Sequence, residues 1–188
     1  KIKVFGTLSR VSPEKGIITL LEGFGEAKKI APHIRLIIVG DCPEEHEEYI
    51  KTVRQHIHEN GLDGTVKILG SRENALGFLK CIDFYVSPSM SEGLPYNILE
   101  SLAAGNPVVA TDIPGNNDII RKSVEGVLIP VNSGRSLAHG LLTLLEMGTE
   151  ECKAMVQNGK ARIRDQFSLS QMTEKTFSLY KKVLEESS

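Results

Sequence analysis

The sequence lacks the charge excess of proteins that bind nucleic acids or membrane surfaces. Its 188 residues hold 22 Lys and Arg against 24 Asp and Glu, a formal net charge of −2, and the basic side chains are scattered. No apolar run approaches the roughly 20 residues of a membrane span, and no signal peptide opens the chain. These absences predict a cytoplasmic protein with no nucleic-acid partner and no transmembrane segment.

Cysteine is also scarce. Cys42, Cys81 and Cys152 are isolated, odd in number and without a C-x-x-C pair. This usage favours a reduced protein with neither a disulfide framework nor a zinc site. Cys81 adjoins an apolar strand, so we expect it to be a small core residue.

His46 lies in the acidic run 44–48, which could suggest a metal site, but we expect that run to form the acid-rich first turn of a helix. His56 and His58 are two apart and point to different helix faces, so they cannot bind one ion together as an i, i+4 pair could. We expect all five histidines at surface or boundary positions.

Strand-like and helix-like segments alternate along the chain. Apolar runs typical of strands covered on both faces lie at residues 1–6, 35–40, 65–69, 82–87, 107–110 and 126–131. Helical patterns cover residues 17–30, 44–60, 74–81, 95–104, 118–122, 134–147, 150–166 and 170–186. Strands separated by helices favour parallel pairing with right-handed crossovers. The sequence therefore predicts an α/β fold with a Rossmann-like, doubly wound parallel sheet of about six strands.

The first residue indicates that more chain precedes this segment. Lys1 is not a methionine, and the chain enters a strand at once. We therefore expect the sequence to begin inside a longer protein.

Residues 87–111 combine the end of a strand, a loop, a helix start and a second strand. Pro95 is expected at the first helical position, where its missing N–H costs no hydrogen bond. The amides of Tyr96 and Asn97 then point out of the helix N-terminus, which favours a phosphate or another anion. Glu92 in the loop and Glu100 on the helix suit hydroxyl groups, since a carboxylate accepts from two OH groups of a sugar or ribose.

Loops after other strands complete the candidate site. Arg10 and Lys15 follow the first strand, and Ser71 and Arg72 follow the third. In open doubly wound sheets, ligands bind outside the carboxyl ends of the strands, where the strand order reverses. We therefore expect these four residues to line one rim together with Glu92.

Three sequence blocks carry a resemblance to a known family. They are GTLSRVSPEKG at 6–16, the E-x7-E motif EGLPYNILE at 92–100, and AGNPVVA at 104–110. Together they resemble the C-terminal, nucleotide-sugar-binding domain of family-4 (group 1) retaining glycosyltransferases of the GT-B fold. The resemblance runs from Gly6 to about Phe167. EGLP and TDIPGNNDII at 111–120 look most like the bacterial exopolysaccharide and capsule enzymes.

The resemblance implies a role for each matching residue on the diphosphate. Arg10 and Lys15 match the family's diphosphate contacts, and the helix N-terminus at Tyr96 and Asn97 would add backbone donors. Charge develops on the diphosphate as the glycosidic bond breaks, so both cations are catalytic candidates. Since no D-x-D stretch is present, the resemblance implies no metal and no cofactor beside a UDP-, GDP- or ADP-sugar substrate.

Roles on the sugar and nucleoside follow in the same way. Glu92, the third catalytic candidate, would bind donor-sugar hydroxyls with the nearby amides of Gly93 and Leu94. Glu100 would bind the ribose hydroxyls. The base would contact the loop formed by Gly70, Ser71 and Arg72.

The resemblance also implies a missing half. In the family the acceptor site, for a glycan or a lipid-linked acceptor, lies on an N-terminal domain that this chain does not contain. Residues 1–167 would form the nucleotide-sugar-binding domain, and a C-terminal helix at 168–188 would cross to the absent domain. We expect this half to bind nucleotide but to turn over little alone. The full-length protein would be cytoplasmic, with a possible place at the inner face of the membrane.

Two positions depart from the family pattern. Pro95 removes an amide that relatives with glycine there offer to the sugar, which predicts altered donor-sugar selection. Residues 116–118 (Asn-Asn-Asp) replace the more usual G-G-x-x-E, and the sequence assigns them no role.

Other functions stay open. The chain could be a non-catalytic nucleotide-binding or interaction module that kept the fold. A sugar-nucleotide epimerase or phosphorylase would need acid/base carboxylates or a pyridoxal lysine, and no such signature stands out. A receiver domain would need an acidic cluster after the first strand, where Gly6, Thr7 and Leu8 stand instead. Tyr96 could stack on a sugar or pack on the sheet.

Overall fold

The computed structural model describes residues 1–72 and 74–186. Its strands are β1 (Lys3–Leu8), β2 (Ile34–Val39), β3 (Val66–Ile68), β4 (Phe84–Ser87), β5 (Val108–Thr111) and β6 (Gly126–Ile129). Its helices are α1 (Ile17–Ile30), α2 (Glu47–Glu59), α3 (Ala75–Leu79), α4 (Tyr96–Ala104), α5 (Asn116–Ile119), α6 (Gly134–Glu146), α7 (Thr149–Gln166) and α8 (Leu169–Glu186). Short 3₁₀ turns lie at Pro13–Lys15 and Glu44–His46.

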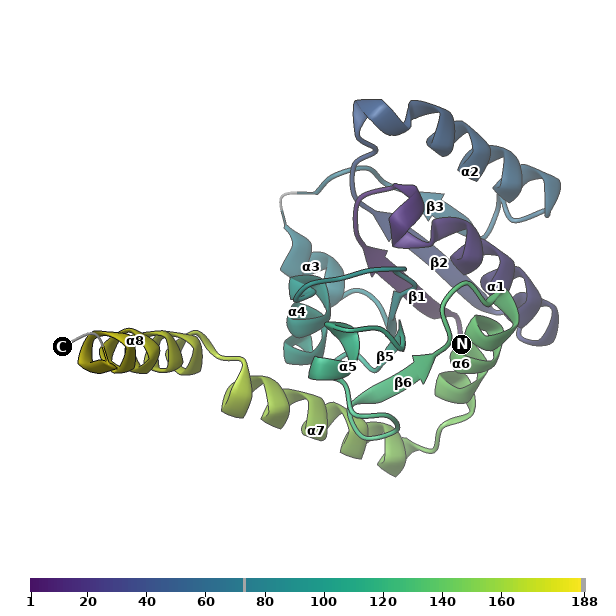
Figure 1. Ribbon diagram of the computed structural model, residues 1–188. Helices are drawn as coiled ribbons and strands as arrows, with labels where there is room; N and C mark the ends of the chain where they lie inside the picture. Colours follow the sequence, from purple (N-terminus) through teal and green to yellow (C-terminus); the bar gives the residue numbers. More distant parts are fainter. Residues whose placement is uncertain (73, 187–188) are drawn as a thin grey trace.

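The six strands form one parallel sheet in the order β3-β2-β1-β4-β5-β6 (Figure 1). This order confirms the predicted doubly wound α/β fold. The strand order reverses between β1 and β4, where Phe5 lies opposite Phe84 and Gly6 opposite Tyr85. Folds of this kind bind their ligands at the carboxyl ends of these two strands.

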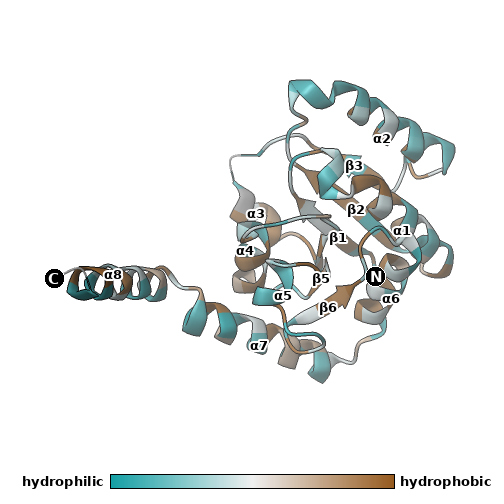
Figure 2. Ribbon diagram, in the orientation of Figure 1, coloured by the Kyte–Doolittle hydropathy of each residue, from teal (hydrophilic) through white to brown (hydrophobic). Residues whose placement is uncertain are grey.

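Helices cover both faces of the sheet, which explains why the strands read as continuous apolar runs (Figure 2). Val86 and Val109 belong to the core shared with α1 and α6. Their neighbours Tyr85 and Val108 belong to the core shared with α3, α4 and α5. Successive side chains point to opposite faces of a strand, so both sets must be apolar for the sheet to be buried.

Three local predictions were wrong. Pro95 precedes the first residue of α4 instead of occupying it: its ψ of 97° is extended, and its carbonyl accepts from the amides of Ile98 and Leu99. The helix predicted at 118–122 lies at Asn116–Ile119, because the Asp118 carboxylate accepts from the Gly115 N–H at 3.0 Å and starts the helix earlier. Cys81 is exposed, since it lies in the turn after α3.

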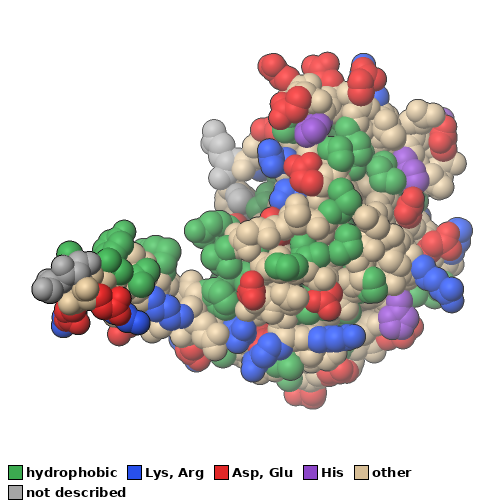
Figure 3. Space-filling model, viewed as in Figure 1, with side chains coloured by type: hydrophobic (Ala, Val, Ile, Leu, Met, Phe, Trp, Pro, Cys, Tyr) green, Lys and Arg blue, Asp and Glu red, His purple; other side chains and the backbone are tan. Residues whose placement is uncertain are grey.

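Helix α7 packs on the domain, whereas α8 extends away from it (Figure 1). The close fit of α7 is set at Gly159, where a Cβ would lie 2.9 Å from the Leu102 side chain. Helix α8 has no buried residue, and its large apolar side chains gather on one side (Figure 3). Residues 187 and 188 of the predicted C-terminal segment lie outside the described residues. None of the helices within 1–72 and 74–186 combines the length and the hydrophobicity needed to cross a membrane.

Deleting residues 168–188 is expected to leave the stability of the domain unchanged. No residue of α8 is buried, so its removal should shift the free energy of unfolding by less than about 0.5 kcal/mol. Thermal unfolding followed by circular dichroism measures this. A deletion that starts at residue 163 is the matched control, because Ile163 and Phe167 pack on the core and their loss should lower the Tm. An equal fall in Tm for both deletions would show that α8 stabilises the domain.

Candidate functional site

Two loops meet at the carboxyl ends of β1 and β4. The Met90 N–H donates to the Glu14 carbonyl at 2.8 Å. Gly16, at a φ of 66°, lies so close to Pro88 that a Cβ would be 2.1 Å from the Pro88 carbonyl oxygen. The loop after β1 is therefore held directly against the loop after β4, as the strand order predicts.

Lys15 and Glu92 form an ion pair between these loops. Lys15 Nζ lies 2.8 Å from Glu92 Oε1, and the two side chains are only 16% and 11% exposed. Both charges are largely withdrawn from water, so each depends on the other for compensation. A ligand that carries both a phosphate and hydroxyl groups could satisfy Lys15 with the first and Glu92 with the second.

Arg10 lies at the outer side of the same loop. Its Nη2 is 3.3 Å from Glu14 Oε1, and its side chain is 60% exposed. The Ser12 hydroxyl donates to the same oxygen at 2.6 Å and is the main reason that the pKa of Glu14 is lowered. An exposed pair of this kind is weak. Arg10 can therefore leave Glu14 for a more highly charged anion at little cost.

The N-terminus of α4 opens toward the same strand ends. The amides of Tyr96 and Asn97 belong to its first turn, where helix N–H groups have no intrahelical acceptor. The Asn97 side chain donates to the Leu8 carbonyl at 2.9 Å and thereby ties α4 to β1. A contact with a diphosphate would come from the Asn97 backbone amide. The Tyr96 side chain is 67% exposed, so it does not pack on the sheet.

Tyr85 stabilises the contact between the end of β1 and the start of α4. Its side chain is fully buried, and its hydroxyl lies 3.2 Å from both the N–H and the carbonyl of Leu8. Burial raises the pKa of Tyr85, which keeps the phenol neutral. A neutral hydroxyl can accept from the Leu8 N–H and donate to its carbonyl, so it fixes the end of β1.

Asp41 links the loop predicted to contact the base to the loop after β1, which carries the predicted diphosphate residues. The Ser71 N–H donates to Asp41 Oδ1 at 2.9 Å, and the Val11 N–H donates to the Asp41 carbonyl at 2.7 Å. Gly70 follows β3 and accepts from the backbone of the loop after β2. Asp41 therefore joins the loops that follow β1 and β3.

The remaining predicted residues stand apart. Glu100 is half-buried on α4, and Arg72 is exposed with Nη1 donating to the Ser71 carbonyl at 3.1 Å. Within 1–72 and 74–186, no hydrogen bond or ion pair joins either of them to Lys15 or Glu92. Gly93 and Leu94 are exposed at the mouth of the site. The structure thus pairs Lys15 with Glu92 directly and shows no direct contact of Glu100 or Arg72 with this pair among the described residues.

Comparison with known proteins identifies the family. The model of the family "Glycosyl transferases group 1" matches residues 1–162. The chain belongs to this family. The group 1 domain is 27% identical over 184 residues to the Escherichia coli UDP-Gal:alpha-D-GlcNAc-diphosphoundecaprenol alpha-1,3-galactosyltransferase, covering 94% of this chain and 45% of that protein.

Solved structures show the same architecture. A crystal structure of Anabaena Alr3699/HepE in complex with UDP and glucose matches the group 1 domain with a TM-score of 0.90 and 26% identity, over 96% of this chain and 48% of that one. The C-terminal domain of a group 1 family protein (LpcC) from Francisella tularensis has the same fold, with a TM-score of 0.81 and 22% identity over 89% and 87% of the two chains. The group 1 domain thus spans about half the length of the full-length relatives that it matches.

Sequence reasoning missed three polar residues of the group 1 domain that hold the site together. Tyr85 lies within the buried strand β4, Asp41 lies two residues after the end of β2, and Thr111 ends β5. The available signal was their position, since all three lie within or directly after an apolar run. A polar group at that point lies near the ligand-binding edge of a doubly wound sheet.

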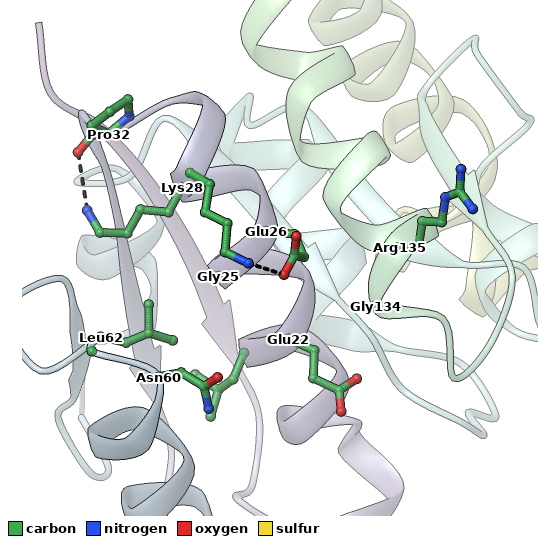
Figure 4. Close-up of a pocket in the computed structure, with 12 residues that line it drawn as sticks. Glu22, Gly25, Glu26, Lys28, Pro32, Asn60, Leu62, Gly134 and Arg135 are labelled. Atoms are coloured by element: carbon green, nitrogen blue, oxygen red, sulfur yellow. Dashed lines mark hydrogen bonds and ion pairs between the residues drawn. The ribbon is translucent and has the colours of Figure 1, made fainter.

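A groove of about 820 Å³ lies elsewhere in the group 1 domain, between α1, the loop after α2 and the start of α6 (Figure 4). Its lysines are already engaged: Lys28 donates to the Pro32 carbonyl and Lys29 to Glu26. None of the predicted site residues lines this groove. The loops after β1 and β4, not the groove, therefore form the candidate site.

Proposed function

We propose that this chain is the donor-binding half of a glycosyltransferase that moves a sugar from a nucleotide-sugar to a glycan or lipid-linked acceptor. The observation that carries the proposal is the largely buried pair of Lys15 and Glu92 at the point where the strand order reverses. It places one cation and one carboxylate where a sugar diphosphate would need both. Similar proteins include a galactosyltransferase that uses UDP-Gal and a diphosphoundecaprenol-linked acceptor and a putative colanic acid biosynthesis glycosyltransferase, which supports the assignment.

The chemistry follows from these two charges. As the bond between the sugar carbon and the diphosphate oxygen breaks, negative charge grows on the leaving diphosphate, and Lys15 and Arg10 stabilise it. The α4 amides add donors that need no reorganisation. Glu92 holds the sugar hydroxyls, with the amides of Gly93 and Leu94. Two cations and a helix N-terminus supply the charge that a metal would otherwise bring, so we propose transfer without a metal. The resemblance to retaining glycosyltransferases leads us to propose retention of configuration as well.

The nucleoside lies at the end of the diphosphate opposite the sugar and is held by a separate set of residues. Glu100 on α4 accepts from the ribose hydroxyls, and Gly70, Ser71 and Arg72 contact the base. The HepE complex with UDP and glucose supports UDP as the first nucleotide to test.

The acceptor half lies outside this chain. Helix α8 presents exposed Leu169, Met172, Phe177 and Tyr180, and the full-length relatives are about twice as long as this chain. We propose that this helix packs against the N-terminal domain of the complete protein, which works in the cytoplasm or at the inner face of the membrane. The 188 residues alone would bind the donor and turn over little.

Binding of one nucleoside diphosphate is expected when the chain is titrated calorimetrically with UDP, GDP and ADP in the presence of EDTA. Arg10→Ala and Glu100→Ala should each weaken that binding about tenfold or more, since a charge-assisted hydrogen bond is worth about 1.5–3 kcal/mol. Arg135→Ala and Glu26→Ala are matched controls, because both residues line the distant groove of Figure 4.

The outcome distinguishes the donor-binding function from the second candidate function, a non-catalytic nucleotide-binding or interaction module. A chain that binds none of the three nucleotides, with or without added Mg²⁺, would favour the non-catalytic interaction module. Binding that appears only with Mg²⁺ would refute metal independence and leave the donor site in place.

A further inference from the structure

The turn after β5 touches the predicted donor-sugar loop, residues 89–94. Gly115 adopts a φ of 87°, and a Cβ there would lie 2.3 Å from the Gly93 carbonyl oxygen. The Asp118 carboxylate accepts from the Gly115 N–H at 3.0 Å and holds this conformation. The turn that contains Gly115 and residues 116–118 (Asn-Asn-Asp) therefore packs directly against the loop.

Two buried side chains add hydrogen bonds between the end of β5 and the donor-sugar loop. The Thr111 hydroxyl donates to the Ser89 carbonyl at 2.5 Å, and Asn116 Nδ2 donates to the Thr111 carbonyl and hydroxyl oxygens at 2.9 and 3.1 Å. Thr111 is 1% and Asn116 0% exposed. A hydroxyl has one proton. Because Asn116 donates to the Thr111 oxygen, the Thr111 proton is left to point at Ser89.

The loop after β1 holds the opposite side of the predicted donor-sugar loop. Met90 donates to the Glu14 carbonyl, and the Glu92 side chain pairs with Lys15. Thr111 thus fixes one side of the peptide between Ser89 and Met90, and Glu14 fixes the other. Glu92 lies two residues after Met90, so the position of its carboxylate depends on these two hydrogen bonds.

We propose that Thr111, oriented by Asn116, is a positioning residue for the donor sugar and not for the nucleotide. It rests on the proposed function. Within the described residues, Thr111 forms no hydrogen bond with the loop after β1, the loop after β2 or the start of α4, which carry or support the proposed diphosphate and base contacts.

The loop after β1 meets the donor-sugar loop through Glu14 and Lys15, but it is also held to the loop after β2 by the hydrogen bond from Val11 to Asp41. The loop that carries Glu92, Gly93 and Leu94 is anchored by Thr111 directly. Loss of the Thr111 hydroxyl therefore loosens the contacts to the sugar and spares those to the diphosphate.

Calorimetric titration of Thr111→Val tests this, with the nucleoside diphosphate that binds the unaltered chain and its glucose, galactose and N-acetylglucosamine esters. We expect affinity for the best sugar ester to fall about tenfold and affinity for the nucleoside diphosphate to change less than about twofold. Thr111→Ser, which keeps the hydroxyl, should restore the affinity for the ester. Thr65→Val is the matched control, since it removes a hydroxyl that donates to the Leu62 carbonyl.

Each outcome decides a different point. Equal losses for both ligands, or no loss for either, would overturn the positioning role while leaving the proposed function in place. An unaltered chain that binds neither nucleotides nor esters would overturn the proposed function and the positioning role with it. If Thr111→Val does not fold, Asn116→Ala carries the same comparison, because it removes the donor that orients the hydroxyl.

Discussion

Lys15→Met is expected to destabilise the domain by about 3–5 kcal/mol and to remove measurable nucleotide binding. The cause is the Glu92 carboxylate, which is 11% exposed and would lose its only ion-pair partner among the described residues. Chemical denaturation measures the stability, and titration calorimetry measures the binding. Because the same lysine is proposed to neutralise the diphosphate, both quantities should fall together in this single variant.

The double variant Lys15→Met/Glu92→Gln separates the two effects. Without a buried carboxylate left unpaired, most of the lost stability should return. Nucleotide binding should stay absent, because the positive charge is still missing. Recovery of binding along with stability would mean that Lys15 only supports the fold. Lys51→Met is the matched control: its pair with Glu48 is 66% and 88% exposed, so its loss should change stability by less than about 1 kcal/mol.

Gly16→Ala is expected to cost about 2–5 kcal/mol of stability and to weaken nucleotide binding in whatever protein still folds. The left-handed conformation of residue 16 costs a non-glycine residue about 1–2 kcal/mol. The added methyl would also lie 2.1 Å from the Pro88 carbonyl oxygen, and relieving such an overlap costs about 1–3 kcal/mol more. To remove this overlap, the loop that carries Lys15 and the loop that carries Glu92 must move apart.

Gly61→Ala isolates the conformational part of that cost. Gly61 has a φ of 64°, but no atom lies within 4 Å of its hypothetical Cβ. Thermal unfolding should show a loss of about 1–2 kcal/mol for this variant and an unchanged nucleotide affinity. If the two alanine variants lose equal stability, the contact between Gly16 and Pro88 does not constrain the site.

Hydrophobic periodicity was sufficient to predict the sheet. The runs at 35–40 and 107–110 are apolar on both faces because helices cover both faces, and this pattern is local in sequence. Boundaries were less secure where a distant or capping contact sets them. The ψ of Pro95 and the early start of α5 follow from carbonyl and carboxylate caps that composition does not show.

Side-chain environments were harder to predict than elements. Cys81 follows an apolar pattern yet is exposed, because Ile82, one residue later, supplies the contact with the core. Tyr96 is exposed because it lies on the first turn of α4, away from the side buried by Ile98 and Leu99.

The sequence by itself determined the alternation of strands and helices, the family, and the residue types available to a sugar diphosphate. Those properties depend on spacing over a few residues or on short motifs. Only the tertiary structure decided that Lys15 pairs with Glu92 across 77 positions, that Tyr85 and Asn97 hold the end of β1, and that Asn116 directs the Thr111 hydroxyl to Ser89. The contacts of Lys15, Tyr85 and Asn97 need β1 beside β4, and the contact of Thr111 with Ser89 needs β5 beside β4. These pairings form only in the folded parallel sheet, so the sequence pattern does not show them.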